Sequence, residues 1–207
     1  PYPIADQIRR EFPNVLRATV TKRMENIVTK MGDEVRQENY VISGDSAFLA
    51  MFPYEVLQGN VNTMLTEPNS VVLTRSKAIA YFGNENVIGQ TLEFPEEFDA
   101  PFKVTGVIQD IPPNTHYTFS MILSDRSLIG QDDYENWDYF NYYVYVELSE
   151  TSTVDAMQAR LDQIMMDQYG EEEHTILELI PLPDIHLHSD FAFEPGIVGN
   201  AQVVQLL

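Results

Sequence analysis

The chain has 207 residues, of which 44% are hydrophobic, and this proportion indicates a folded globular protein rather than a disordered tail. Its 32 acidic and 12 basic residues give a formal net charge of −20, which argues against nucleic acid as a partner, because phosphate binding needs clustered lysine and arginine. The chain contains no cysteine, so disulfides, thiol catalysis and cysteine-based metal sites are excluded.

The first third of the chain predicts a short helix followed by a meander of strands. The helix is expected over 4–12, because Pro13 stops it. Strands are expected over 14–21, 25–30 and 34–43, with turn residues at 31–33. Such a meander favours an antiparallel sheet.

The middle of the chain predicts alternating short helices and strands. Asp45 is placed to cap a helix that runs to Met51, and Thr74 is expected to cap a helix over 75–82 that Gly83 ends. Residues 124–137 are polar and predict a loop. The remaining segments are an extended stretch over 54–57, a helical turn over 60–65, and strands over 70–73, 102–110 and 117–123.

The last third predicts a strand, a helix and a second strand. The strands are expected over 142–148 and 175–180, and the helix over 152–169, where Gly170 ends it. The apolar stripe of this helix consists of Val154, Met157, Leu161, Ile164 and Met165. Neither end of the chain carries a start or closing signal, and no apolar run reaches the roughly 20 residues of a membrane helix. We therefore expect a soluble part of a longer protein.

Residues 44–46 raise the question of serine catalysis. An apolar strand that runs into Gly-Asp-Ser resembles the opening block of GDS-type serine esterases, with Ser46 as the nucleophile. Those enzymes supply the base as Asp-x-x-His, whereas Asp184 stands two residues before His186 and four before His188. The spacing favours the alternative, in which Ser46 begins a helix that Asp45 caps.

A histidine-rich segment over 184–190 raises the question of a metal site. In a strand, alternate residues share a face, so His186 and His188 would project together with Asp184 and Asp190, and two histidines with a carboxylate can bind zinc or iron. No further pair of ligands stands at a convincing spacing upstream. We therefore expect a solvated strand face and no metal ligand.

A run of aromatic residues is the remaining candidate. Such residues can hold a ligand or a partner, although they more often pack in the core or at a sheet edge. Tyr134, Trp137, Tyr139 and Phe140 are the candidate partner or ligand surface, and Tyr142, Tyr143 and Tyr145 continue the run.

An ordered series of four blocks lies between residues 52 and 116. The blocks read FPY…LQGN over 52–60, SVVLTRSKA over 70–78, YFGNENVIGQTL over 81–92 and VTGVIQDIPPNTH over 104–116. Together they resemble the extracytoplasmic core domain of MacB-type, FtsX-like ABC transporter permeases, and most of all the large permeases of Bacteroidetes-type bacteria. Residues 182–189 resemble the closing segment of that branch, whereas 125–138 carry little of the resemblance.

The resemblance implies an α+β fold with two lobes. Residues 1–51 and 138–207 would form a lobe similar to the porter modules of efflux pumps, and 52–137 a mixed α/β lobe inserted into it. In this family the domain stands on the outer face of the cytoplasmic membrane, between the first and second membrane helices, so the chain would be periplasmic.

The resemblance also implies a mechanical function without catalysis, cofactor or metal. A cytoplasmic ATPase would drive a permease homodimer or heterodimer, whose outer domains move a cargo or a periplasmic or outer-membrane partner in export or efflux. The cargo is left open among peptides, lipoproteins, drugs and signals. Two alternatives stay open: a periplasmic module that binds or senses a peptide or lipid, and a GDS-type hydrolase that uses Ser46.

Overall fold

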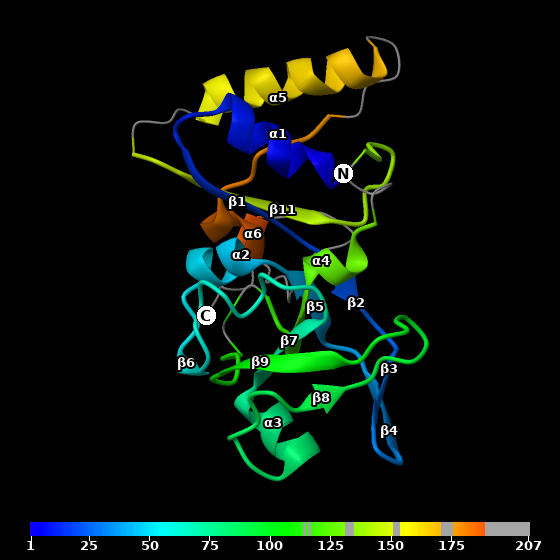
Figure 1. Ribbon diagram of the computed structural model, residues 1–207. Coiled ribbons are helices and arrows are strands. Elements are labelled where there is room, and N and C mark those ends of the chain that lie inside the picture. Colours follow the sequence, from blue (N-terminus) through cyan, green and yellow to red (C-terminus); the bar gives the residue numbers. More distant parts are fainter. Residues whose placement is uncertain (114, 116, 131–134, 151–153, 171–175, 189–207) are drawn as a thin grey trace. The chain divides into compact units, whose positions relative to one another are not determined.

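The structure is a computed structural model that describes residues 1–113, 115, 117–130, 135–150, 154–170 and 176–188, with 186–188 described by their backbone (Figure 1). The chain falls into two compact units. The first is made of Pro1–Pro113 and Phe119–Glu147, and the second of Asn114–Thr118 and Leu148–Leu207. The fold mixes helices and sheets, as predicted, while the division into a porter-like and an inserted lobe stays a prediction.

The first unit is built around a mixed seven-stranded sheet. Its order is β2 (Arg23–Met24), β5 (Val41–Gly44), β10 (Met121–Ser124), β7 (Ser70–Thr74), β9 (Phe102–Ile108) and β6 (Val56–Gln58), with β8 (Thr91–Leu92) beside β9. Strands β5 and β10 pair in parallel, as do β7 and β9, whereas the other pairs are antiparallel. The sheet is mixed because helix α3 (Arg75–Phe82) lies on the crossover that brings β9 alongside β7 in parallel. The antiparallel pairing predicted for the first third of the chain is confirmed for the strands found over 27–31 and 34–38.

The middle strands β7 and β10 are buried along their whole length. Their nearly continuous apolar residues suit strands that are covered on both faces. Next to β9, the rings of Phe94, Phe98 and Phe102 pack against one another with centroids 4.8 to 6.3 Å apart. This core supports the helices and the hairpin that carry the polar contacts described below.

Two smaller strand pairs accompany the main sheet. Strands β3 (Ile27–Met31) and β4 (Glu34–Glu38) form an antiparallel hairpin, and Lys30 joins it to Glu93 through two backbone hydrogen bonds of 2.8 and 2.9 Å. Strand β1 (Val15–Thr21) pairs with β11 (Tyr143–Leu148). The predicted meander is therefore wrong in its first step, because β1 pairs with a distant strand instead of the next one.

The predicted strand over 34–43 is in fact two strands, separated at Asn39 and Tyr40. The side-chain oxygen of Asn39 accepts a hydrogen bond from the backbone N–H of Asn26 at 3.1 Å. The carbonyl of Tyr40 accepts from the backbone N–H and the hydroxyl of Ser120, at 2.7 and 3.1 Å. These bonds hold the chain where it leaves the hairpin for the main sheet.

The helices of the first unit largely confirm the predictions. They are α1 (Pro3–Glu11), α2 (Ser46–Met51), α3 and α4 (Asp125–Leu128). Asp45 caps α2 by accepting the backbone N–H of Phe48 at 2.8 Å, and Gly83 ends α3 in the left-handed region at φ 74°. Helix α4 replaces the beginning of the predicted loop over 124–137.

The cap of α3 differs from the prediction. The side chain of Thr74 makes no capping hydrogen bond. Instead Asp110, just after β9, accepts from the backbone N–H and the hydroxyl of Ser76 at 2.9 and 2.6 Å. The cap therefore comes from the strand that lies beside β7, which local sequence cannot indicate.

The second unit is described over α5 (Val154–Tyr169), α6 (Leu182–His188) and their surroundings. Four of the five predicted stripe residues of α5 are buried, whereas Val154 is exposed. Within the described part of the chain, no helix is long and apolar enough to cross a membrane.

The predicted strand over 175–180 is wrong for its described residues, 176–180, which belong to no strand. The side-chain amide of Gln158 on α5 holds this segment instead. Its nitrogen donates to the carbonyl of Leu177 at 2.6 Å, and its oxygen accepts the backbone N–H of Leu179 at 2.9 Å. One side chain thus binds both backbone groups that a neighbouring strand would bind.

Candidate functional site

Ser46 lies at the first position of α2, as the helix-start interpretation predicts. Its hydroxyl donates to the backbone carbonyl of Asn62 at 3.3 Å, rather than to a base among the described residues. Asp45 is engaged as the helix cap. The local geometry of Ser46 is therefore that of a structural serine.

The histidine-rich segment does not form the strand that would place His186 and His188 on one face. Residues 182–188 form helix α6, so the prediction of a strand over 184–190 is wrong for 184–188, while Asp190 lies outside the described residues. Pro183 suits the first turn of a helix, because the amide hydrogen that it lacks would have no partner there. Among the residues that the structure describes, no three acidic or histidine side chains gather where they could hold a metal ion.

The aromatic run divides into an inward and an outward part. Tyr145 on β11 packs edge-on against Phe52, with ring centroids 5.1 Å apart. Trp137 is half-buried, whereas Tyr139 and Phe140 are 38% and 43% exposed. Tyr134 lies outside the described residues. The outward part of the run thus begins at Tyr139.

Tyr139, Phe140, Tyr142 and Lys22 are called the aromatic surface below. The ammonium of Lys22 lies 5.3 Å from the ring centroid of Tyr139 and 5.8 Å from that of Tyr142. The two rings meet edge to face at 5.8 Å. Cation–π and edge-to-face contacts of this kind favour one orientation of the Tyr139 and Tyr142 rings.

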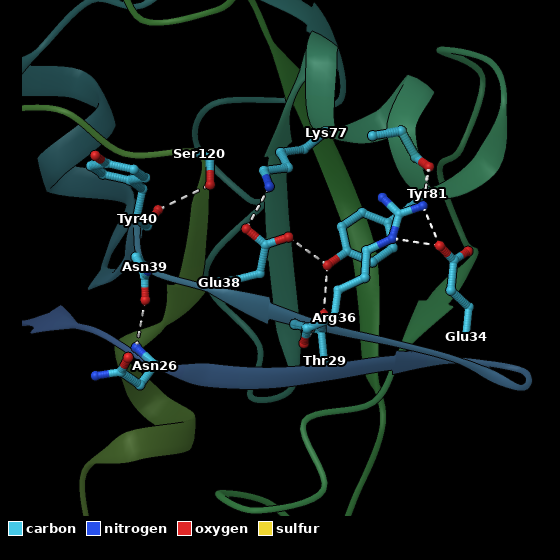
Figure 2. A network of polar contacts seen from close by, with 11 residues as sticks. Asn26, Thr29, Glu34, Arg36, Glu38, Asn39, Tyr40, Lys77, Tyr81 and Ser120 are labelled. Atoms are coloured by element: carbon cyan, nitrogen blue, oxygen red, sulfur yellow. Dashed lines mark hydrogen bonds and ion pairs between the residues drawn. The ribbon is translucent and has the colours of Figure 1, made fainter.

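A polar network joins the β3–β4 hairpin to helix α3 (Figure 2). Glu38 is only 5% exposed and accepts from the Tyr81 hydroxyl at 2.7 Å and from the Lys77 ammonium. The Tyr81 hydroxyl also contacts the Thr29 hydroxyl at 2.5 Å. The buried carboxylate on β4 is thus bound by two side chains of α3, and one of them also contacts β3.

Arg36 forms the outer part of the same network (Figure 2). Its guanidinium lies 4.7 Å from the ring centroid of Tyr81 and donates to the carbonyl of Ala80 at 2.9 Å and to Glu34 at 2.7 Å. Burial raises the pKa of the Tyr81 hydroxyl, so that the group stays protonated and remains a donor to Glu38. The arrangement holds a hairpin on a helix and contains no free nucleophile.

This network could not be predicted from the sequence, because Glu38 lies on a strand and Tyr81 on a helix 43 residues away. The available signal was the spacing of Lys77 and Tyr81, which share one face of α3 at i and i+4. Nothing local identifies Glu38 as their partner.

Comparison with known proteins identifies the fold. The family model of MacB-like periplasmic core domains matches residues 1–164. A domain assigned to a permease protein of Porphyromonas gingivalis has a TM-score of 0.69 at 24% identity, covering 81% of this chain and 76% of that chain. A comparison with curated proteins gives no match.

Two further solved structures share the fold. The periplasmic region of MacB from Actinobacillus actinomycetemcomitans has a TM-score of 0.61 at 16% identity, over 83% of this chain and 76% of that chain. The extracellular domain of the noncanonic ABC-type transporter YknZ from Gram-positive bacteria has a TM-score of 0.57 at 15% identity, over 80% and 82%. With the family model matching most of its length, the chain belongs to the family of MacB-like periplasmic core domains, the extracytoplasmic domains of MacB- and FtsX-like ABC transporter permeases.

Proposed function

We propose that this domain transmits ATP-driven conformational change in an ABC transporter permease to a cargo or a partner protein during export or efflux, without catalysis of its own. The observation that carries the proposal is the family match over residues 1–164. Family membership supports an extracytoplasmic location. We propose in addition that the domain lies in the sequence between two helices of the permease that cross the cytoplasmic membrane.

The internal contacts of the first unit suit a part that moves as one rigid body. The Glu38 network ties the hairpin to α3, and Asp110 ties the start of α3 to the end of β9. The buried carboxylate of Glu38 holds its elements at fixed distances, because protein interiors are close-packed and resist compression. A load applied to one element therefore reaches the others.

The partners belong to the same proposal. A cytoplasmic ATPase subunit or domain would act through the membrane helices, and the permease would be a homodimer or heterodimer. A periplasmic or outer-membrane protein would receive the movement. The acidic surface disfavours nucleic acid as a partner.

A spin-label experiment on the intact permease tests the transmission. The 207 residues contain no cysteine, so a single cysteine at Ile88, which is 47% exposed, gives one label per copy of the domain. We expect the distance distribution between the two labels to shift by more than its own width between the ADP-bound and vanadate-trapped states. A variant that cannot hydrolyse ATP is the control and should show no shift on adding ATP. Identical distributions in both trapped states would refute the proposal.

We further propose that the aromatic surface contacts the cargo or partner, with Tyr134 and Trp137 beside it in the sequence. Tyr139 and Phe140 are large apolar side chains exposed next to each other, and aromatic residues are enriched in protein interfaces. A peptide or lipid ligand is the alternative occupant, which would make the domain a binding or sensing module.

Photo-crosslinking in the intact permease tests this surface. A benzoylphenylalanine at Tyr139 should give a discrete crosslinked product, because a surface that binds a partner holds it at one place. The matched control is the same group at Leu16, an apolar residue that is 59% exposed on β1. Equal products from the two positions would mean that the aromatic surface is ordinary solvent-exposed surface.

A further inference from the structure

One member of the aromatic surface, Lys22, carries a charge. This half-buried residue lies between β1 and β2, and both of its backbone groups are bound by Ser43 of β5. The backbone N–H of Lys22 donates to the Ser43 hydroxyl at 3.0 Å, and its carbonyl accepts the backbone N–H of Ser43 at 2.9 Å. Ser43 is only 3% exposed. The main sheet therefore sets the point from which the Lys22 side chain leaves the backbone.

The rings beside the Lys22 ammonium are connected to the interior of the first unit. Tyr142 packs edge-on against Tyr2, with ring centroids 5.6 Å apart. The Tyr2 hydroxyl donates to Asp125 Oδ2 at 3.2 Å, and Asp125 is only 7% exposed. Contacts thus run from a buried carboxylate through Tyr2 and Tyr142 to the exposed ring of Tyr139.

The ammonium of Lys22 differs from most other cations of this chain in having no ion pair with a described carboxylate. Acidic residues outnumber basic ones by 32 to 12, so partners are plentiful. The basic residues that do pair with a carboxylate are Arg9, Arg17, Arg23, Lys30, Arg36, Arg75, Lys77 and Arg160. A lysine ammonium has three N–H donors, and the nearby rings of Tyr139 and Tyr142 offer it no lone pair of a carboxylate. An anion can therefore bind Lys22 without breaking an ion pair inside the domain.

We propose that the aromatic surface binds a protein segment that carries a single aspartate or glutamate beside an apolar side chain. The carboxylate would pair with Lys22, and the apolar side chain would lie on Tyr139 and Phe140, which are 38% and 43% exposed. The inference rests on the proposal that this surface contacts a partner, and it adds the chemistry of that partner.

The charges of the domain disfavour other occupants. Nucleic acids and anionic lipid surfaces are bound by several clustered cations, whereas the aromatic surface contains one, on a chain of net charge −20. A lysine or arginine of a partner would bring a like charge to Lys22. The matching partner therefore presents one carboxylate at this place and is neutral or basic around it, which is the complement of one cation on an acidic domain.

Charge variants of Lys22 in the intact permease test the proposal. Benzoylphenylalanine at Phe140 is the probe, because it is itself a phenylalanine derivative and leaves Lys22, Tyr139 and Tyr142 in place. Lys22→Met, which keeps a long side chain without the charge, should lower the yield of the crosslinked product about tenfold, as expected for the loss of one close charge pair across an interface. Lys22→Glu should abolish the product. Lys22→Arg should keep most of it, because a guanidinium retains the charge and stacks on aromatic rings.

Lys103→Met is the matched control. Lys103 is an exposed lysine on β9 and, like Lys22, forms no ion pair with a carboxylate in the described part of the chain. Its replacement removes the same charge from the domain at another place, so the crosslink at position 140 should keep its yield. A loss equal to that of Lys22→Met would mean that net charge, and not a pair with Lys22, governs binding, and would overturn the proposal.

Mass spectrometry of the crosslinked product then locates the segment on the partner. We expect an aspartate or glutamate in it, and replacing that acid by lysine should restore the product with Lys22→Glu. A crosslinked segment without an acidic residue, or a product with the added mass of a lipid, would overturn the proposal even if the Lys22 variants failed to fold.

The outcomes separate this inference from the function on which it rests. If Lys22→Met and Lys22→Glu left the yield unchanged, the carboxylate would be wrong while the aromatic surface remained a partner surface. If the unchanged protein gave no product at position 140, both the surface and its proposed ligand chemistry would be wrong. The distance change between spin labels at position 88 tests the transmission of movement and does not depend on either result.

Discussion

Replacing Lys77 by alanine is expected to lower the free energy of unfolding of the domain by about 3 kcal/mol. Removing one partner of a buried ion pair leaves an uncompensated buried charge, and Glu38 is only 5% exposed. The expected value is at the lower end of the usual range, because the Lys77 side chain is itself 27% exposed and Tyr81 still donates to Glu38. Urea denaturation followed by circular dichroism measures the change.

Arg75→Ala is the matched control on the same helix. Arg75 pairs with Glu85 at 2.6 Å, and the two side chains are 48% and 36% exposed, so loss of this pair should cost less than about 1 kcal/mol. Both substitutions introduce alanine into α3 and change its helix propensity in the same direction. If the two variants lost the same free energy of unfolding, Lys77 would not compensate the buried charge of Glu38.

Helix ends were the most predictable part of the fold, because their signals are local. Pro13 follows the end of α1, Asp45 caps α2, and Gly83 and Gly170 stand directly after α3 and α5. Each of these residues acts within a few positions of the chain. Boundaries were therefore right to within about two residues for these helices.

Strand pairing was poorly predictable, because it is decided by residues far apart in the sequence. Alternation marked 14–21 as a strand but gave no sign that it pairs with 143–148. The break at Asn39 and Tyr40 depends on Asn26 and Ser120, and neither contact has a local pattern. The segment over 184–190 was expected as a strand, whereas its described residues, 184–188, belong to helix α6, since a short apolar–polar run suits both periods.

The sequence revealed the candidate residues better than their roles. It singled out the aromatic run but could not tell that Tyr145 packs on Phe52 while Tyr139 is exposed. It used the acidic excess only to argue against nucleic acid as a partner, and the structure buries two of those acids, Glu38 and Asp125, at junctions between elements. Burial is a property of the assembled fold, so a count of charges could not separate these two carboxylates from the rest.

Replacing Gly59 by alanine is expected to destabilise the domain by about 3 to 4 kcal/mol, a large effect for the addition of a single methyl group. Gly59 follows β6 and has φ +96°, which side chains with a Cβ rarely adopt. An added Cβ would lie 2.6 Å from the carbonyl oxygen of Thr105 and 3.0 Å from the Cα of Gly106, both on β9. Because these are backbone atoms of a buried strand, they cannot move aside as a flexible side chain would. Thermal or urea unfolding gives the value.

Gly83→Ala separates the two causes. Gly83 also has a positive φ, +74°, but an added Cβ there would meet nothing within 4 Å. Its replacement should therefore cost only the left-handed backbone conformation, about 1 to 2 kcal/mol. The difference between the two variants then measures the contact between β6 and β9, on which the edge of the main sheet depends. If Gly59→Ala cost no more than Gly83→Ala, the close approach of Gly59 to Thr105 would be wrong, and β6 would be free to separate from β9.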